Sequence, residues 1–462
     1  MNRLAINLVV AIFAFILVLA GTAPAQSAES DIQQRLEQLE KEMESLKALL
    51  KQQQAEKERE RAERQDEKKK LTDLEKKAKE PGFLSLKGMR IKPYGKVKLT
   101  MAYNDSQVSN EGYAMWALSE GHDEHVRNDD QFDFTAKETR LGFAIEGPLY
   151  NNISIRGQVE ADFYGNATDQ RKAEIMLRHA YLELGFPSFK LLAGQTWDVI
   201  SPLNADSLNY SSGYNMGNIG YRHPQLRISR DFSLGGENIL STRLALALTE
   251  GVNTNLKTKD GNIADNKTGS LPTIQARMGY STPMKGRRLD VGISGHYGEE
   301  EWDIGEKGSD DKFASWSVNA DLTIPITSKL IFIGEFFRGA NLDTYLGGIG
   351  QGVSIWQDDV NKTYKLVKDK TINSIGGWAE FSYLASEKLT FNVVGGIDDP
   401  DNGDLNTTNP RERNIACWAN VLYRIIPPVT LGLEYMHIQT DYRGDNNDGV
   451  ANRIQTSAIY EF

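Results

Sequence analysis

The sequence predicts an all-β transmembrane barrel of about 16 antiparallel strands, preceded by an α-helical coiled-coil stalk. Three observations predict this arrangement. Apolar residues recur at every second position in many segments from residue 91 onward, they recur in heptads within residues 26–80, and one continuous apolar run stands at the N-terminus. No later apolar stretch is long enough for a transmembrane helix, and a chain that crosses a bilayer without helices must form a closed barrel.

Residues 1–25 have the features of a cleaved secretory signal. Arg3 precedes an apolar run from Leu8 to Ala20, and the small residues Ala23, Pro24 and Ala25 follow it. An uncleaved membrane anchor is the alternative, but it needs about 20 apolar residues and this run is shorter. We therefore expect secretion through the inner membrane and cleavage after residue 25.

Residues 26–80 are dense in Glu, Lys, Gln and Arg and predict a periplasmic coiled-coil stalk. Apolar residues spaced alternately by four and three form the seam of such a helix; they are Ile32, Leu36, Leu39, Met43, Leu46 and Leu50. The same register continues through polar seam positions and meets apolar residues again at Leu71, Leu74 and Ala78. Over residues 53–70 a solvated single helix or a charged linker is the alternative, because polar seams bury little. Pro81-Gly82 ends the helix and begins a linker over residues 81–90.

Residues 91–462 alternate with a period of two and predict the barrel wall. In the first strand Val97, Leu99 and Met101 alternate with Lys96 and Lys98. Many such segments run about 10 to 13 residues, the length that a tilted strand needs to cross a bilayer. A soluble sandwich is the alternative, but its dry core would not tolerate the charges on the second face. We therefore expect lipid on one face of each strand and water on the other.

The connections between these segments alternate in length. The short ones are typical of periplasmic turns and lie at 147–151, 186–188, 282–286 and 426–428. The long polar ones are typical of extracellular loops and lie at 105–130, 198–220, 250–270, 299–312, 340–371, 398–412 and 441–451. This spacing predicts about sixteen strands, with eighteen as the alternative.

Charged residues on the inward phase of the strands are the candidate pore-lining residues. The basic ones are Lys96, Lys98, Arg140, Arg156, Arg243, Arg277, Arg424 and Arg453, and Glu160 and Asp162 share their phase. Rings of Arg or Lys in a pore favour anions, and opposed rows of opposite charge would produce a transverse field that selects polar solutes. The alternative is that a neighbouring carboxylate balances each arginine and the pairs only stabilise the wall.

The sequence offers no catalytic motif. It lacks a G-x-S-x-G elbow, an H-E-x-x-H helix and a P-loop, and the pair His122 and His125 provides fewer ligands than most metal sites need. The single cysteine, Cys417, shares the apolar face of its strand and is expected to face lipid. We therefore predict a protein that is not an enzyme, needs no cofactor or metal and binds no nucleic acid.

Several short segments carry a family resemblance. They include Phe132-Asp133-Phe134, Thr139 to Phe143, Leu177 to Leu184, Leu192 to Trp197, Arg222 to Arg227, Gly334 to Asn341 and Gly396 to Pro400. Together they resemble the general trimeric porins and look closest to the DcaP-like branch, whose members carry an N-terminal coiled coil. The resemblance implies a homotrimeric, sixteen-stranded diffusion channel for small hydrophilic solutes, surrounded by outer-membrane lipid and lipopolysaccharide.

Two further expectations come from this resemblance. In that family the loop after the strand ending at Trp197 folds into the barrel, which here implicates the segment from Asp198 to Tyr221. Its candidate residues are Asp198, Asp206, Tyr210, Tyr214, Tyr221 and the adjoining Arg222; an ordinary surface loop is the alternative. The closing strand, with Tyr460 and Phe462, resembles the C-terminal signal that the barrel-assembly machinery reads.

The leading hypothesis is an outer-membrane porin for passive diffusion of small hydrophilic solutes, with a preference for organic anions such as dicarboxylates. A structural or adhesive protein that tethers the envelope to peptidoglycan through its coiled coil is the second hypothesis. An outer-membrane enzyme such as a phospholipase is the third. Single-channel conductance separates the first two, and a lipase assay of the purified protein tests the third.

The heptad pattern generates the first testable prediction. Because no lone helix can bury the seam from Leu36 to Leu50, an isolated peptide of residues 29–80 should form a helical oligomer in analytical ultracentrifugation and circular dichroism. Deleting the same residues from the whole protein should weaken its trimer, which cross-linking would measure. A peptide that stays monomeric and unfolded at high concentration would contradict the stalk prediction.

Overall fold

The computed structural model describes only part of the chain. The described residues are 85–86, 89–110, 112–120, 129–166, 172–248, 266–267, 269–302, 311–358, 363–406, 410–444 and 447–462. The chain divides into a unit of residues 1–82 and a unit of residues 83–462. The predicted signal, the predicted stalk with its seam, and most of the linker therefore lie outside the described residues. Within the described part, no helix is both long and apolar enough to span a membrane.

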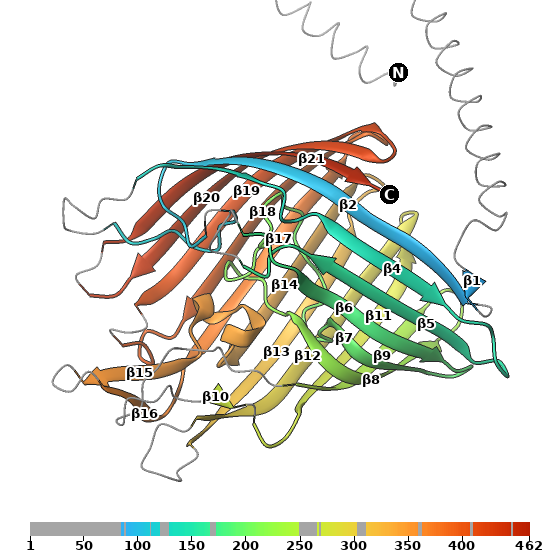
Figure 1. Cartoon of the computed structure of the whole chain (residues 1–462), viewed down its shortest axis with the longest axis horizontal. Coiled ribbons are helices and arrows are strands. Elements are labelled where there is room, and N and C mark those ends of the chain that lie inside the picture. The colour runs from blue at the N-terminus through green and yellow to red at the C-terminus, as the bar shows by residue number, and fades with distance from the viewer. Residues whose placement is uncertain are drawn as a thin grey trace, which may run out of the picture. The chain divides into compact units, whose positions relative to one another are not determined.

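One closed antiparallel sheet forms the wall of the second unit (Figure 1). Its strands are β1 (Ser85–Leu86), β2 (Met89–Asn104), β3 (Gln131–Thr135), β4 (Arg140–Glu146), β5 (Ser154–Asp162), β6 (Met176–Gly185), β7 (Lys190–Trp197), β8 (Arg222–Ser233), β9 (Ile239–Ala247), β10 (Asn266–Lys267), β11 (Thr273–Met284), β12 (Arg287–Trp302), β13 (Asp311–Pro325), β14 (Leu330–Ala340), β17 (Asn373–Leu384), β18 (Leu389–Pro400), β19 (Arg411–Ile426), β20 (Val429–Tyr442) and β21 (Gly449–Glu461). β15 (Val353–Asp358) and β16 (Thr363–Thr371) form a separate hairpin.

The wall has sixteen strands within the described residues, because β3 and β4 form one interrupted strand and β1 and β10 are short additions. Both β3 and β4 pair with β2, at Thr100–Asn104 and at Arg90–Lys96 respectively. The predicted closed barrel of about sixteen antiparallel strands is confirmed. The break between β3 and β4 matters below, because Glu138 lies in it.

The seam between β2 and β21 closes the barrel. Their register runs from Lys96 opposite Glu461 to Asn104 opposite Arg453. Beyond it, the Gly95 amide donates to the Phe462 carbonyl (3.1 Å) and the Phe462 amide donates to the Gly95 carbonyl (3.0 Å). With this seam formed, the sheet has no open edge, so backbone groups in the bilayer are paired across strands.

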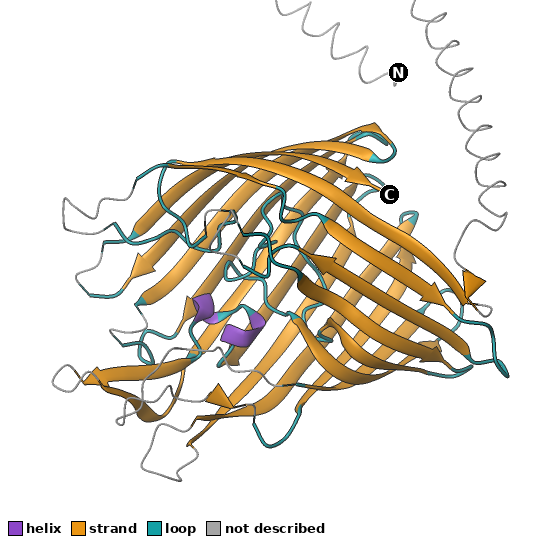
Figure 2. Ribbon diagram, in the orientation of Figure 1, coloured by secondary structure: helices purple, strands orange, loops and turns teal. Residues whose placement is uncertain are grey.

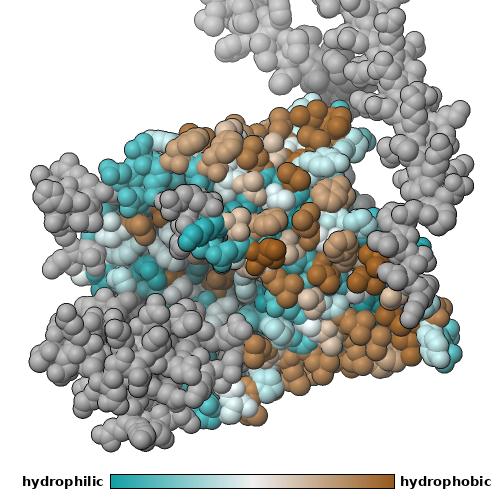
Figure 3. Space-filling model, in the orientation of Figure 1, coloured by the Kyte–Doolittle hydropathy of each residue, from teal (hydrophilic) through white to brown (hydrophobic). Residues whose placement is uncertain are grey.

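The two faces of the wall differ as the period-two pattern predicts. On β2, Val97 and Met101 are exposed on the outside, whereas Lys98 and Thr100 are buried inside the barrel. Exposed apolar side chains cover much of the outer wall in Figure 3. Cys417 is exposed on this outer face. The arrangement is that of a barrel with a lipid-facing apolar band.

The strand β14 carries aromatic residues on both faces. Phe336 is 50% exposed on the outer wall, but its neighbour Phe337 points inward and is 1% exposed. The inner aromatic packs in a buried cluster with Ile200, Leu342 and Tyr345 from two connecting segments. Apolar side chains occur on both faces of the strand here because connecting segments, and not only water, fill the interior of the barrel at this point.

Three connecting segments fold into the barrel, and Figure 2 draws their loops in front of the strands. We name them the first inner loop (residues 105–120), the constriction loop (Asp198 to Tyr221) and the second inner loop (residues 341–352). The last contains two 3₁₀ turns, η2 (Asp343–Tyr345) and η3 (Gly348–Gly350). Side chains from all three loops are fully buried, among them Ala114, Met216 and Ile349.

The seam generates the second testable prediction. Deleting Phe462 removes both closing backbone bonds to Gly95 and the ring that stacks on Tyr460 at 6.0 Å. The variant should therefore accumulate in the periplasm, with little heat-modifiable folded barrel on gels. Phe462→Tyr keeps the ring and both bonds and should behave as the parent. Parent-like outer-membrane levels of the deletion variant would contradict this role of the terminal residue.

Candidate functional site

The constriction loop leaves and re-enters the wall at one place. The Asp198 amide donates to the Tyr221 carbonyl (2.9 Å), and the Tyr221 amide donates to Asp198 Oδ2 (2.9 Å). The same carboxylate lies 3.0 Å from Nδ1 of His223 and accepts from Nε2 of Gln275 (2.9 Å). Asp198 therefore fixes the base of the loop to β8 and β11.

Three buried carboxylates on the opposite wall hold the body of the loop. Each comes from a different strand (β14, β17 or β20) and accepts a backbone N–H of the loop. The pairs are Leu203 to Glu335 (2.8 Å), Asp206 to Glu380 (2.7 Å) and Leu208 to Glu434 (2.8 Å). A buried backbone N–H that lacks a partner is costly, and these carboxyl oxygens supply the acceptors. The loop is thereby bound along one side of the barrel.

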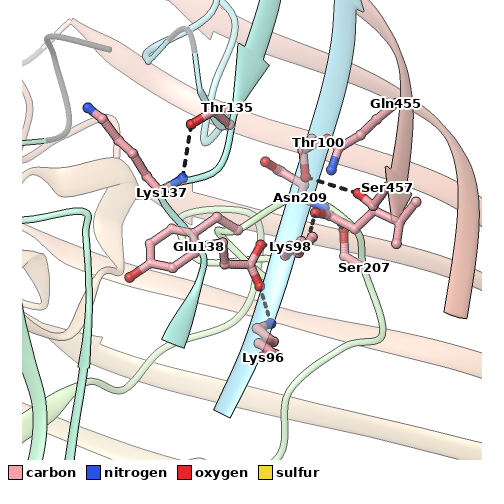
Figure 4. Close-up of polar contacts among 12 residues, drawn as sticks. Lys96, Lys98, Thr100, Thr135, Lys137, Glu138, Ser207, Asn209, Gln455 and Ser457 are labelled. Atoms are coloured by element: carbon pink, nitrogen blue, oxygen red, sulfur yellow. Dashed lines mark hydrogen bonds and ion pairs between the residues drawn. The ribbon is translucent and has the colours of Figure 1, made fainter. Parts of the chain in front are cut away.

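A basic group on β2 braces the same loop (Figure 4). Lys98 forms an ion pair with Glu138 and donates to the Leu208 carbonyl (2.8 Å). Lys96 lies 2.5 Å from the other oxygen of Glu138. One carboxylate thus serves two lysines, and both predicted pore-lining lysines are engaged in holding the wall and the loop.

A cavity of about 340 Å³ remains between the constriction loop and the wall formed by β4 to β8. Its lining is aromatic and cationic. The residues that matter below are Tyr113, Arg140, Tyr164, Arg178, Trp197, Tyr210, Tyr221 and Arg222. A concave pocket lined by aromatic side chains and a few polar groups is the usual form of a small-molecule site.

The three arginines of this cavity differ in how they are neutralised. Arg178 is bound to two carboxylates, Glu160 at 2.6 Å and Asp162 at 2.7 Å. Arg140 pairs more loosely with Glu138, at 3.8 Å.

Arg222 makes no ion pair within the described residues. Its Cζ atom lies 4.6 Å from the ring centroid of Trp197 and 4.6 Å from that of Tyr221. Nε of Arg222 and Nε of Arg140 are buried and have no hydrogen-bond partner in the described part of the chain. These two guanidinium groups are therefore the ones available to a solute.

The other candidate residues of the constriction loop take different positions. Tyr210 donates to Asp162 (2.8 Å), and burial together with this carboxylate raises the pKa of Tyr210, so the phenol stays neutral. Tyr214 is buried and donates to Asn204 (3.2 Å). The side chain of Asp206 is exposed.

The structure does not bring the remaining predicted arginines to the cavity. Arg156 and Arg424 are exposed near the ends of strands that carry short turns. Arg277 pairs with Asp321 (2.5 Å), and Arg243 is partly buried on the neighbouring β9. Arg453 is 0% exposed and donates to Asn104 and Gln455, so it braces the wall instead of lining the cavity.

Sequence reasoning missed Arg178 as a lining residue because the strand phase slips there. The pairing of β5 with β6 shifts register between Glu160 and Ala161, so Arg178 and His179 both lie inside the barrel. A bulge of this kind adds one unpaired residue and inverts the alternation on one side of it. Tyr113 and Tyr164 were missed because they lie outside the strands, where the period gives no information.

The loop anchors generate the third testable prediction. Glu434→Ala leaves the Leu208 amide and the Ser207 hydroxyl without their acceptor and removes one of the two acceptors of the Asn209 amide, at a cost of about 1–3 kcal/mol for a buried group left unpaired. The variant should unfold at lower temperature and show noisier open-channel current. Glu412→Ala on the adjacent β19, whose carboxylate accepts no hydrogen bond in the described residues, is the control. Unchanged melting and noise in the first variant would contradict the anchoring role.

Comparisons with known proteins give similarity in fold. No protein-family model matches the sequence, and no curated protein matches it. The crystal structure of the outer membrane channel DcaP of Acinetobacter baumannii is similar over 82% of this chain and 99% of that one, with 22% identity and a TM-score of 0.64. An anion-selective porin from Comamonas acidovorans is similar over 81% of this chain and 100% of that one, with 9% identity and a TM-score of 0.52. The chain therefore has the fold of these outer-membrane channels.

Proposed function

We propose that this protein is an outer-membrane porin through which small hydrophilic solutes diffuse passively, with a preference for small organic anions and dicarboxylates among them. The observation that carries the proposal is the cavity inside the closed barrel, where Arg222 makes no ion pair in the described residues and Arg140 has only a loose pair with Glu138, at 3.8 Å. Guanidinium groups bind carboxylates in two-point hydrogen bonds and stay charged at any physiological pH. Two such groups in one cavity suit a solute with two carboxylates.

The local charge balance supports this preference. On this side of the barrel the cations Lys96, Lys98, Arg140, Arg178 and Arg222 face the carboxylates Glu138, Glu160 and Asp162. Counted with the buried Lys137, Asp133 and Asp198 of the same side, six positive charges stand against five negative ones, which leaves a formal excess of one. The carboxylates of the opposite wall are bonded to loop amides behind the constriction loop. A solute in the cavity therefore meets the positive excess first, in a field directed across the barrel.

Assembly and location form part of the same proposal. A cleaved signal, a terminal strand that the assembly machinery reads and an apolar outer wall suit insertion into the outer membrane, in contact with lipid and lipopolysaccharide. The seam from Ile32 to Leu50 supports a homotrimer held partly by its stalk. The stalk also keeps the second hypothesis, a tether to peptidoglycan, open to the conductance test above.

The fourth testable prediction concerns ion selectivity. Replacing both Arg140 and Arg222 by Ala should shift the reversal potential toward cations at low salt, because two positive charges at the cavity are lost. The loss of a charge-assisted hydrogen bond, about 1.5–3 kcal/mol, should weaken binding of a small dicarboxylate roughly tenfold or more. The shift should shrink as salt approaches 1 M, where the screening length is about 3 Å. Planar-bilayer recordings across a salt gradient measure it.

The matched control is Arg156→Ala together with Arg424→Ala, which removes the same charge at exposed sites away from the cavity. This pair should change the reversal potential much less. Equal shifts for both pairs would show that total barrel charge, and not this cavity, sets selectivity. An unchanged reversal potential with only lower thermal stability for the Arg140 and Arg222 variant would assign these arginines to the wall structure and refute the anion preference.

A further inference from the structure

Three tyrosines from three separate segments meet at one edge of the cavity. Tyr113 comes from the first inner loop, Tyr164 follows β5, and Tyr210 belongs to the constriction loop. The ring centroids of Tyr164 and Tyr210 are 4.1 Å apart, and Tyr113 lies 5.3 Å and 5.2 Å from them, edge to face. We name these residues the tyrosine cluster. All three rings line the cavity, so the cluster closes it on the side where the first inner loop and the constriction loop meet.

Hydrogen bonds fix two of the rings and the backbone beside the third. Tyr210 is held by Asp162, and the Tyr164 hydroxyl lies 3.5 Å from the Gly112 carbonyl of the first inner loop. Next to Tyr113, the Ala114 amide donates to Asn209 Oδ1 (3.0 Å) and the Ala114 carbonyl accepts from Asn209 Nδ2 (2.7 Å). The constriction loop thus holds the first inner loop by its backbone.

The Tyr113 ring itself is attached only by packing. Its hydroxyl makes no hydrogen bond in the described residues. Ala117, further along the same loop, bonds to Thr440 and to Tyr442 on the wall, so the loop has anchors that do not involve the ring. Truncating Tyr113 should therefore enlarge the cavity without releasing the loop.

We infer that Tyr113 is a specificity-determining residue that sets, with Tyr164 and Tyr210, the largest solute able to pass, an inference that rests on the proposed function. A pore selects by its diameter as well as by its charges. The cluster contributes bulk and no charge: burial raises the pKa of Tyr113 to about 12 and also raises those of Tyr164 and Tyr210. Size selection by these rings is thus separable from charge selection by Arg140 and Arg222.

The test uses the full-length protein in liposomes that swell as uncharged sugars enter. Arabinose, glucose and sucrose form a size series that the arginines do not sort by charge. Tyr113→Ala should raise the ratio of the sucrose rate to the arabinose rate roughly twofold or more, and Tyr113→Trp should lower it, because pore width limits the larger sugar. Tyr113→Phe keeps the ring and should match the parent. Tyr103→Ala, on the outer wall and 43% exposed, is the control for loss of a tyrosine elsewhere.

Reversal potentials of the same variants distinguish a failure of this inference from a failure of the proposed function. If the parent conducts and all Tyr113 variants keep the parental sugar ratio, Tyr113 does not limit size and only this inference fails. If Tyr113→Ala changes the sugar ratio and also abolishes anion preference, the ring acts by positioning the arginines, which again overturns the inference. If the parent neither conducts nor supports swelling, the proposed function fails and this inference with it. Opposite changes for Ala and Trp at a constant reversal potential would support it, and a misfolded Ala variant would leave the Trp variant to decide.

Discussion

The bonds between wall carboxylates and loop amides are the interactions on which the rest of this structure depends. A closed barrel satisfies its own backbone groups across its strands, but a loop that crosses the interior has no ladder to join. Glu335, Glu380 and Glu434 supply the missing acceptors for the constriction loop. They also position the loop against one side of the barrel, and the cavity is what remains on the other side.

This arrangement places acidic and basic side chains on opposite sides of the barrel. Carboxylates that accept loop amides are buried behind the loop, whereas the β4 to β8 wall carries arginines that project into the cavity. Burying a carboxylate is costly unless hydrogen bonds compensate it, so the loop and the acids require each other. The net charge of −10 for the whole chain gives no indication of the positive excess at the cavity. In the proposed function, selectivity follows from where charges are placed and not from their sum.

The sequence predicted the wall well and the cavity poorly, for physical reasons. A period of two is enforced by lipid on one face, so the inward phase of Lys98 and Arg140 could be read directly. The bulge that turns both Arg178 and His179 inward leaves no mark in the periodicity. The unpaired state of Arg222 depends on the distance between segments far apart in the chain, which no local pattern encodes. Tyr113 belongs to a loop whose position is set by Asn209, almost a hundred positions later.

The second inner loop completes the support of the constriction loop from the side that the wall acids do not reach. The Leu346 and Tyr345 carbonyls accept from Asn215 (2.8 Å) and Gly220 (2.7 Å), and Tyr345 packs in the buried apolar cluster. Leu346 and Ile349 both have positive φ. This backbone conformation is unfavourable for both residues, and more so for Ile349 because its side chain is β-branched. The contacts of the loop must outweigh that strain. A rigid constriction is therefore built from two loops that hold each other, and the glycine-rich segment from Gly347 to Gly352 supplies the tight turns that let the second one reach the first.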